Sequence, residues 1–80
     1  MQRFTLLSRP GCYLCEDFEA EVLAHFGEQL EIDTVQVDRH PQWQAQYGLK
    51  IPVLLDAVDR FVCAVVVDAD AIAAALALSR

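Results

Sequence analysis

Residues 9–15 read RPGCYLC, and this stretch decides how the rest of the chain is interpreted. Its two cysteines, Cys12 and Cys15, are separated by two residues. They stand where a short apolar run gives way to a helical pattern. Pro10 and Gly11 are typical of the turn between such elements. The spacing therefore predicts a pair of thiols held at a strand-to-helix turn.

The residues on either side of this turn follow strand and helix patterns. Residues 4–8 form a short apolar run, which predicts a buried strand. Residues 13–26 carry an apolar residue at every fourth position and acids elsewhere, which predicts an amphipathic helix that ends at Gly27. Residues 30–38 alternate well enough to predict a second strand, and a crossover this long makes the two strands parallel. The apolar stripe of the helix is Leu14, Phe18, Val22 and Phe26.

The second half of the chain predicts a short helix, a hairpin and a last helix. Pro41 suits the first turn of the short helix. Asp68 and Asp70 are N-cap candidates for the last helix. The two strands of the hairpin, residues 51–55 and 60–67, are joined by a connection so short that they must be antiparallel. The predicted elements are a helix over residues 42–47, strands over 51–55 and 60–67, and a helix over 71–78. Trp43 and Tyr47 are expected to pack inward.

Composition limits the classes of function. The 80 residues, 55% of them hydrophobic, predict a single α/β domain over residues 1–80. A formal net charge of −6 argues against binding to nucleic acid or to an anionic membrane surface. The first residues lack a signal pattern and no stretch is long enough to span a bilayer, so we expect a cytoplasmic protein. A monomer is expected as well. In that compartment a close cysteine pair is more often catalytic or metal-binding than structural.

The chemistry of a Cys-x-x-Cys pair follows from where the helix begins. Side chains three apart inside a helix have β-carbons about 5–6 Å apart, whereas a disulfide needs about 3.8 Å. If Cys12 is the N-cap, it can swing toward Cys15 and its sulfur faces the free N–H groups of the first turn. We therefore expect Cys12 to be the nucleophile, with a pKa below about 8.5, and Cys15 the buried resolving thiol. Arg9 would favour the thiolate, whereas Glu16 and Asp17 would disfavour it.

Other interpretations of the cysteines stay open. Structural zinc usually takes four ligands, and one chain offers no second cysteine pair, so no metal site is expected within it. Two chains could pool Cys12 and Cys15 around zinc or an iron–sulfur cluster. A protein-binding domain without turnover is a third interpretation. Cys63 is expected to be a buried hydrophobe on one strand face with Phe61 and Val65. His25 and His40 are expected to be surface or cap residues rather than metal ligands.

The motifs resemble a known family. Cys12-Tyr13-Leu14-Cys15 after a strand, with Ile51-Pro52-Val53 opening the third strand, is similar to the glutaredoxins of the thioredoxin-fold superfamily. The segment from Ser8 to Cys15 is closer still to a small bacterial glutaredoxin-like family whose function is not assigned. The likeness covers essentially the whole chain in element order. It implies a βαβ-α-ββα three-layer sandwich with a four-stranded mixed sheet.

The resemblance also implies an activity and a site. It implies that the protein is a thiol-disulfide oxidoreductase that takes part in cell redox homeostasis. It also implies that the Ile51–Pro52 peptide bond is cis and lies against the dithiol. Because Pro52 has no N–H, the backbone of Ile51 would be free to pair with an extended peptide or glutathione. The expected catalytic residues are Cys12 and Cys15, and the expected substrate-binding residues are Arg9, Tyr13, Ile51, Pro52 and Asp68. Expected partners are protein disulfides or glutathione mixed disulfides, with no cofactor beyond glutathione as a candidate cosubstrate.

This chain departs from strongly glutathione-active members at three places. They usually carry a basic residue in the short second helix, for which Lys50 is the candidate here. They have Pro-Tyr between the cysteines, where this chain has Tyr13-Leu14. They also have a Gly-Gly turn before the last helix, which cradles the glutathione carboxylate. Here the equivalent stretch, residues 66–70, contains no glycine.

Overall fold

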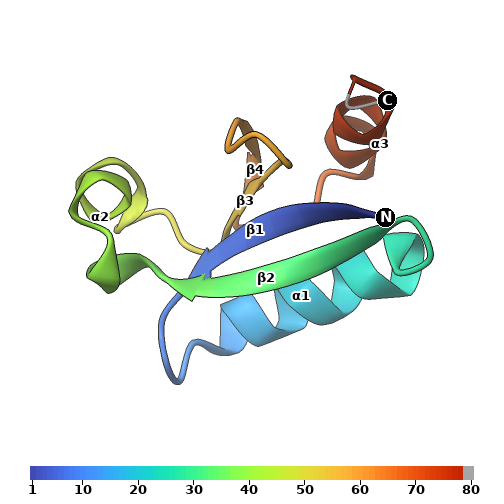
Figure 1. Ribbon diagram of the computed structural model, residues 1–80. Coiled ribbons are helices and arrows are strands. Elements are labelled where there is room, and N and C mark those ends of the chain that lie inside the picture. The colour runs from blue at the N-terminus through green and yellow to red at the C-terminus, as the bar shows by residue number, and fades with distance from the viewer. Residues whose placement is uncertain (79–80) are drawn as a thin grey trace.

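The computed structural model, which describes residues 1–78, builds one sheet in the strand order β2-β1-β3-β4 (Figure 1). β1 and β2 are parallel, whereas β3 runs antiparallel to both β1 and β4, so the sheet is mixed as predicted. The elements are β1 (Gln2–Ser8), α1 (Tyr13–Phe26), β2 (Leu30–Gln36), the 3-10 turn η1 (Val37–Arg39), α2 (Pro41–Tyr47), β3 (Val53–Leu55), β4 (Phe61–Ala64) and α3 (Ala69–Leu78).

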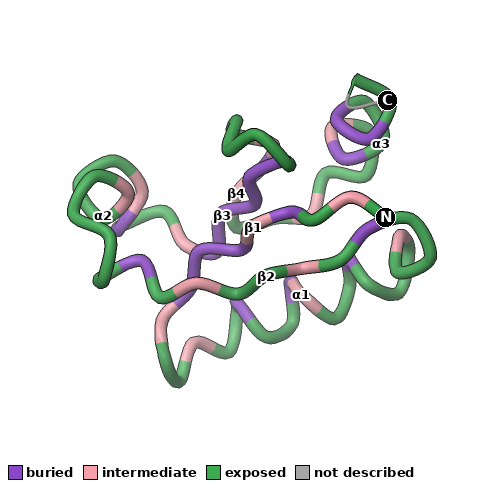
Figure 2. Tube along the Cα trace, in the orientation of Figure 1, coloured by how far each residue is buried: buried purple, intermediate pink, exposed green. Residues whose placement is uncertain are grey.

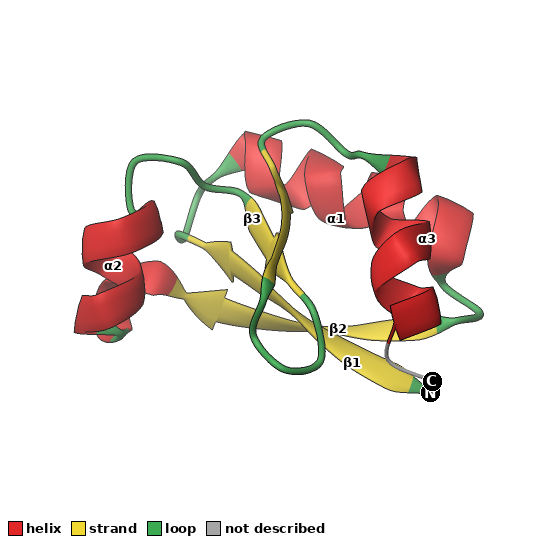
Figure 3. Cartoon of the chain, turned by 90° about the horizontal axis from the view of Figure 1, so that it is seen from above, coloured by secondary structure: helices red, strands yellow, loops and turns green. Residues whose placement is uncertain are grey.

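Both faces of the sheet are covered by helices, which gives the predicted three layers. Alternation along β1 sends Phe4 and Leu6 into one core and Leu7 into another. The first core takes residues from α1 and α3, and the second takes Trp43 and Tyr47 from α2. α2 and α3 lie at opposite sides of the strands when seen from above (Figure 3). Buried residues are concentrated in the central strands (Figure 2).

The helix after the dithiol has the predicted bounds but a different buried stripe. Its buried residues are Cys15, Phe18 and Val22, whereas Leu14 is 60% exposed. Four residues turn the helix by about 40° more than one full turn. Residues spaced by four therefore shift gradually around the helix and do not all face the sheet. Cys15 takes the inner position at the first turn because it lies three residues before Phe18.

Two predicted strands end early. β2 stops at Gln36, and residues 37–39 turn away as η1 instead of continuing to residue 38. β4 stops at Ala64 instead of residue 67. Val65 then has a φ of 67°, and the Val66 N–H donates to the Ala64 carbonyl at 2.7 Å, which makes a γ-turn of the rarer hand. A β-branched residue in this region is uncommon, so the end of β4 could not be inferred from strand propensity.

A bulge overturns one prediction about β4. Leu54 is opposite Cys63, but Leu55 is opposite Phe61, so Val62 is an extra residue without a partner on β3. The bulge breaks the expected alternation. Cys63 is buried in the first core, whereas Phe61 is 53% exposed and stacks on Tyr47 at the other face of the sheet. The expectation that Phe61, Cys63 and Val65 share one face is therefore wrong.

Candidate active site

The turn that leads into the dithiol follows directly from its sequence. The Cys12 N–H donates to the Arg9 carbonyl at 3.2 Å, which closes a four-residue turn. Pro10 occupies the second position, where its fixed φ is suitable, and Gly11 occupies the third with a φ of 77°. These are the residues that a type II turn prefers. The space around Gly11 is open, so its backbone conformation alone requires a glycine.

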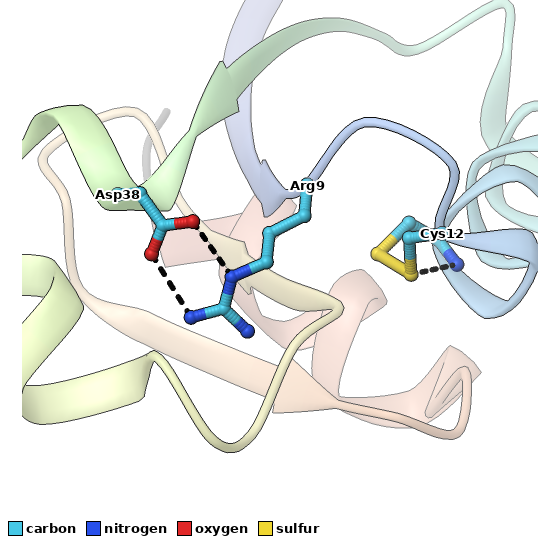
Figure 4. Close-up of polar contacts among 4 residues, drawn as sticks. Arg9, Cys12 and Asp38 are labelled. Atoms are coloured by element: carbon cyan, nitrogen blue, oxygen red, sulfur yellow. Dashed lines mark hydrogen bonds and ion pairs between the residues drawn. A yellow bond between two sulfur atoms is a disulfide. The ribbon is translucent and has the colours of Figure 1, made fainter.

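Cys12 is the N-cap of α1, as predicted. Its backbone is extended, with φ −82° and ψ 102°, and its Sγ accepts a hydrogen bond from the Cys15 N–H at 3.1 Å (Figure 4). Cys12 and Cys15 are joined as a disulfide with their α-carbons 5.2 Å apart. Cys15 is 4% exposed, whereas Cys12 is only partly buried. A disulfide bond of a substrate could therefore reach Cys12 far more easily than Cys15.

Arg9 is held by a partner that the sequence did not indicate. Its Nε and one terminal nitrogen donate to the two carboxylate oxygens of Asp38 at 2.8 and 3.0 Å (Figure 4). The hydrogen bond from Arg9 lowers the pKa of Asp38, and the same contact raises the pKa of Arg9. Arg9 lies in the turn after β1 and Asp38 lies in η1 after β2. Their two hydrogen bonds therefore anchor the turn to η1, although the two residues are 29 apart in sequence.

The sheet register brings most of the predicted site residues to one end. Leu7 pairs with Val53, so the turn after β1 and the residues before β3 lie at the same sheet end. The Ile51–Pro52 bond is cis, as the resemblance implied, and the Val65 N–H donates to the Pro52 carbonyl at 2.8 Å. Pro52 is fully buried and Ile51 packs against the second core. Among residues 1–78, no hydrogen bond is found for the backbone of Ile51.

The other two predicted substrate-binding residues have different surroundings. Tyr13 is 82% exposed beside Cys12 in the first turn of α1. Asp68 accepts a hydrogen bond from the Ala71 N–H at 3.0 Å and so caps α3, as predicted. Asp70, the second cap candidate, instead lies inside the first turn of α3, where its charge suits the helix dipole.

Cys63 is the third thiol and lies apart from the dithiol in the first core. Burial raises the pKa of the Cys63 thiol. The folded state therefore favours the neutral form of the Cys63 thiol. Its contribution to the free energy of unfolding is fully present below the ordinary cysteine pKa and is lost as the pH rises through the raised pKa.

We expect the Cys63 thiol to react at pH 8 at least about tenfold more slowly than a free cysteine, because burial limits access and the thiolate is the reactive form. In the oxidised protein Cys63 is the free thiol, so alkylation rates can be followed by mass spectrometry across a pH series. The same protein unfolded in urea is the control and should react at the free rate. Equal rates for the folded and unfolded protein would contradict the assignment.

Neither a metal cluster nor a membrane span is found in the described part of the chain. No group of three or more His, Cys, Asp or Glu side chains within residues 1–78 is placed to hold a metal ion. No helix formed by these residues is long and apolar enough to cross a bilayer.

The mixed sheet, with helices on both faces and a Cys-x-x-Cys disulfide at the start of α1, defines a thioredoxin-like fold with a dithiol site. The chain belongs to the glutaredoxin-like family: the model of the Glutaredoxin-like domain (DUF836) matches residues 3–77. No curated protein matches the chain.

Two solved structures have the same fold. Protein Ne2328 from Nitrosomonas europaea is 25% identical, with a TM-score of 0.81 over 91% of this chain and 88% of that one. Protein XcR50 from X. campestris is 31% identical, with a TM-score of 0.67 over 96% of this chain and 99% of that one. These likenesses, with the family match, agree with the resemblance seen in the sequence.

Proposed function

We propose that the protein is a thiol-disulfide oxidoreductase in which Cys12 attacks and Cys15 resolves. One observation supports this most directly: the Cys12 Sγ is the side-chain cap of α1 and accepts the Cys15 N–H. A thiolate at that position would receive the same hydrogen bond, strengthened by its charge, together with the positive end of the helix dipole. Both effects favour the reactive form of Cys12 at neutral pH.

The proposed reaction moves two electrons to the substrate. The Cys12 thiolate attacks one sulfur of a substrate disulfide, forms a mixed disulfide and releases the other substrate sulfur as a thiolate. Cys15 then loses its proton and attacks the Cys12 sulfur, which releases the second substrate thiolate and leaves the Cys12–Cys15 disulfide. The two released thiolates take up protons. An external thiol reductant returns the pair to the dithiol state.

The remaining predicted residues have supporting roles in this proposal. The unpaired backbone of Ile51 would hydrogen-bond to the substrate chain beside its disulfide, and Pro52 would hold that segment in place. Tyr13 would contact the substrate from the other side of Cys12. Arg9 would add positive charge near the thiolate while it stays paired with Asp38, and Asp68 would face the substrate from the start of α3. Protein disulfides and glutathione mixed disulfides are both candidate substrates.

Cys15→Ser is expected to trap the mixed disulfide, because Cys12 can attack but nothing in the site can resolve the product. The reduced variant is mixed with a small uncharged disulfide, such as hydroxyethyl disulfide, and its mass is measured. We expect one substrate half added per chain, at Cys12, whereas the wild type gains no mass and loses two hydrogens. Labelling at Cys63 instead would contradict the assignment of Cys12.

Protein purified without oxygen separates this proposal from the two-chain metal or cluster alternative. We expect its dithiol to be free, with neither bound zinc nor a coloured cluster. About one zinc ion or one cluster for every two chains, lost on Cys12→Ser, would favour the alternative.

A further inference from the structure

An open groove runs along β4, at the far side of the sheet from β2. Its volume is about 540 Å³. β4 itself forms one side of the groove, and residues 66–70, which lead into α3, form the other. The γ-turn at Val65 joins the two sides, because it ends β4 and redirects the chain.

Backbone groups of β4 are available in this groove. β4 is an edge strand, and in the part of the chain that the structure describes its one neighbour in the sheet is β3. The Val65 N–H points at β3, so the N–H of the preceding Ala64 points away from β3 by the alternation of an antiparallel pair. The neighbouring pair Leu54 and Cys63 exchanges hydrogen bonds by the same alternation, so the Val62 carbonyl, which shares a peptide plane with the Cys63 N–H, also points away from β3. Ala64 and Val62 both line the groove, so an added strand would find a donor at Ala64 and an acceptor at Val62.

The two edges of the sheet differ in how they are protected. The edge strand β2 exposes the carboxylates of Glu31 and Asp33, and Glu31 also pairs with Arg3 at 3.4 Å. Charged side chains of this kind discourage pairing with another chain. β4 reads Phe-Val-Cys-Ala and carries no charge. An uncharged edge beside an open groove is suited to the addition of a strand.

We propose that this β4 groove binds an extended, apolar segment of a client protein that carries a basic residue, added as a strand to β4. Asp68 and Asp70 line the groove, and none of its lining residues within the described range 1–78 is basic, which favours a cationic segment. A second copy of this chain is disfavoured as the occupant, because each copy has a net charge of −6. This proposal rests on the proposed function: the substrates of the dithiol would be disulfides of polypeptides.

The groove also sets where the reacting disulfide must lie in the client. A strand added to β4 is separated from β1 by three strand spacings, about 14 Å. Extended chain covers about 3.3 Å per residue, so four or five residues connect the added strand to Cys12. β4 ends at the dithiol end of the sheet, as the Val65–Pro52 hydrogen bond shows. The client cysteine is therefore expected four or five residues beyond the bound segment.

Binding of a peptide without cysteine tests the groove independently of redox chemistry. The probe is a fluorescent eight-residue peptide in which valine alternates with threonine and two of the threonines are replaced by lysine. Fluorescence anisotropy with the oxidised protein measures its affinity. We expect a matched peptide with glutamate in place of lysine to bind at least about tenfold more weakly. Asp70→Lys should weaken binding of the lysine peptide about fivefold, whereas Asp33→Lys, the same charge change on the β2 edge, should alter it less than twofold.

A modified peptide tests strand addition without changing the protein. N-methylation of alternate peptide amides removes the N–H groups that would donate to β4, and should weaken binding about tenfold. Equal affinities for the lysine and glutamate peptides, equal effects of the two charge reversals, or no effect of N-methylation would each overturn the proposal. So would a dimer, seen by sedimentation, that excludes the peptide from the groove. Peptide binding by a protein that does not reduce hydroxyethyl disulfide would support the groove but contradict the proposed function.

Discussion

Replacing Cys12 with serine is expected to lower the rate of disulfide reduction at least about a thousandfold, because a serine hydroxyl cannot replace the attacking thiolate. The reduced protein is mixed with one equivalent of hydroxyethyl disulfide, and the oxidised product is separated by mass after acid quenching. A single turnover needs no external reductant, so the result reports on the dithiol alone. Activity within tenfold of the wild type would contradict the proposed mechanism.

The same substitution has little effect on the fold for a specific reason. Cys12 caps α1 through its side chain, and serine is among the preferred N-cap residues. Cys12→Ser should therefore unfold at nearly the same urea concentration as the reduced wild type. Cys63→Ala is the matched control for the loss of a thiol elsewhere: its activity should equal that of the wild type, because Cys63 is buried away from the dithiol.

Leu54→Ala is expected to lower the free energy of unfolding by about 2–5 kcal/mol. Leu54 is fully buried at the centre of β3, between Leu6 on β1 and Cys63 on β4. A domain of this size is typically stable by only about 4–12 kcal/mol, so the loss is a large share of the total. Urea unfolding of the oxidised protein, followed by circular dichroism, measures the change.

Leu49→Ala is the matched control, because it removes the same atoms from a side chain that is fully exposed. It should change the free energy of unfolding by less than about 0.5 kcal/mol. If the two variants lost the same stability, the assignment of Leu54 to the core would be wrong.

Local sequence determined the parts of the site that depend on neighbouring residues. Pro10 and Gly11 specify the turn, because one has a fixed φ and the other adopts a positive φ without steric cost. Cys12 as the N-cap and the bounds of α1 follow from the same few residues. The resemblance also indicated the family and the cis bond before Pro52. These features need no information about the far end of the chain.

Tertiary structure decided the features that join distant segments. The pairing of Arg9 with Asp38 depends on the parallel register of β1 and β2, which brings residues 29 apart into contact. The bulge at Val62 separates Phe61 from Cys63, although a period of two places them together. The positive φ of Val65 ends β4 against the preference of a β-branched residue.

The chain therefore determined by itself how the dithiol turn is formed, because turns and caps are governed by interactions within a few residues. Only the folded sheet decided the features that join distant segments: the ion pair at Arg9, the hydrogen bond from Val65 to the buried Pro52, and the groove beside β4. Those features depend on strand register and on a bulge, and both are set by packing between segments that lie far apart in the sequence.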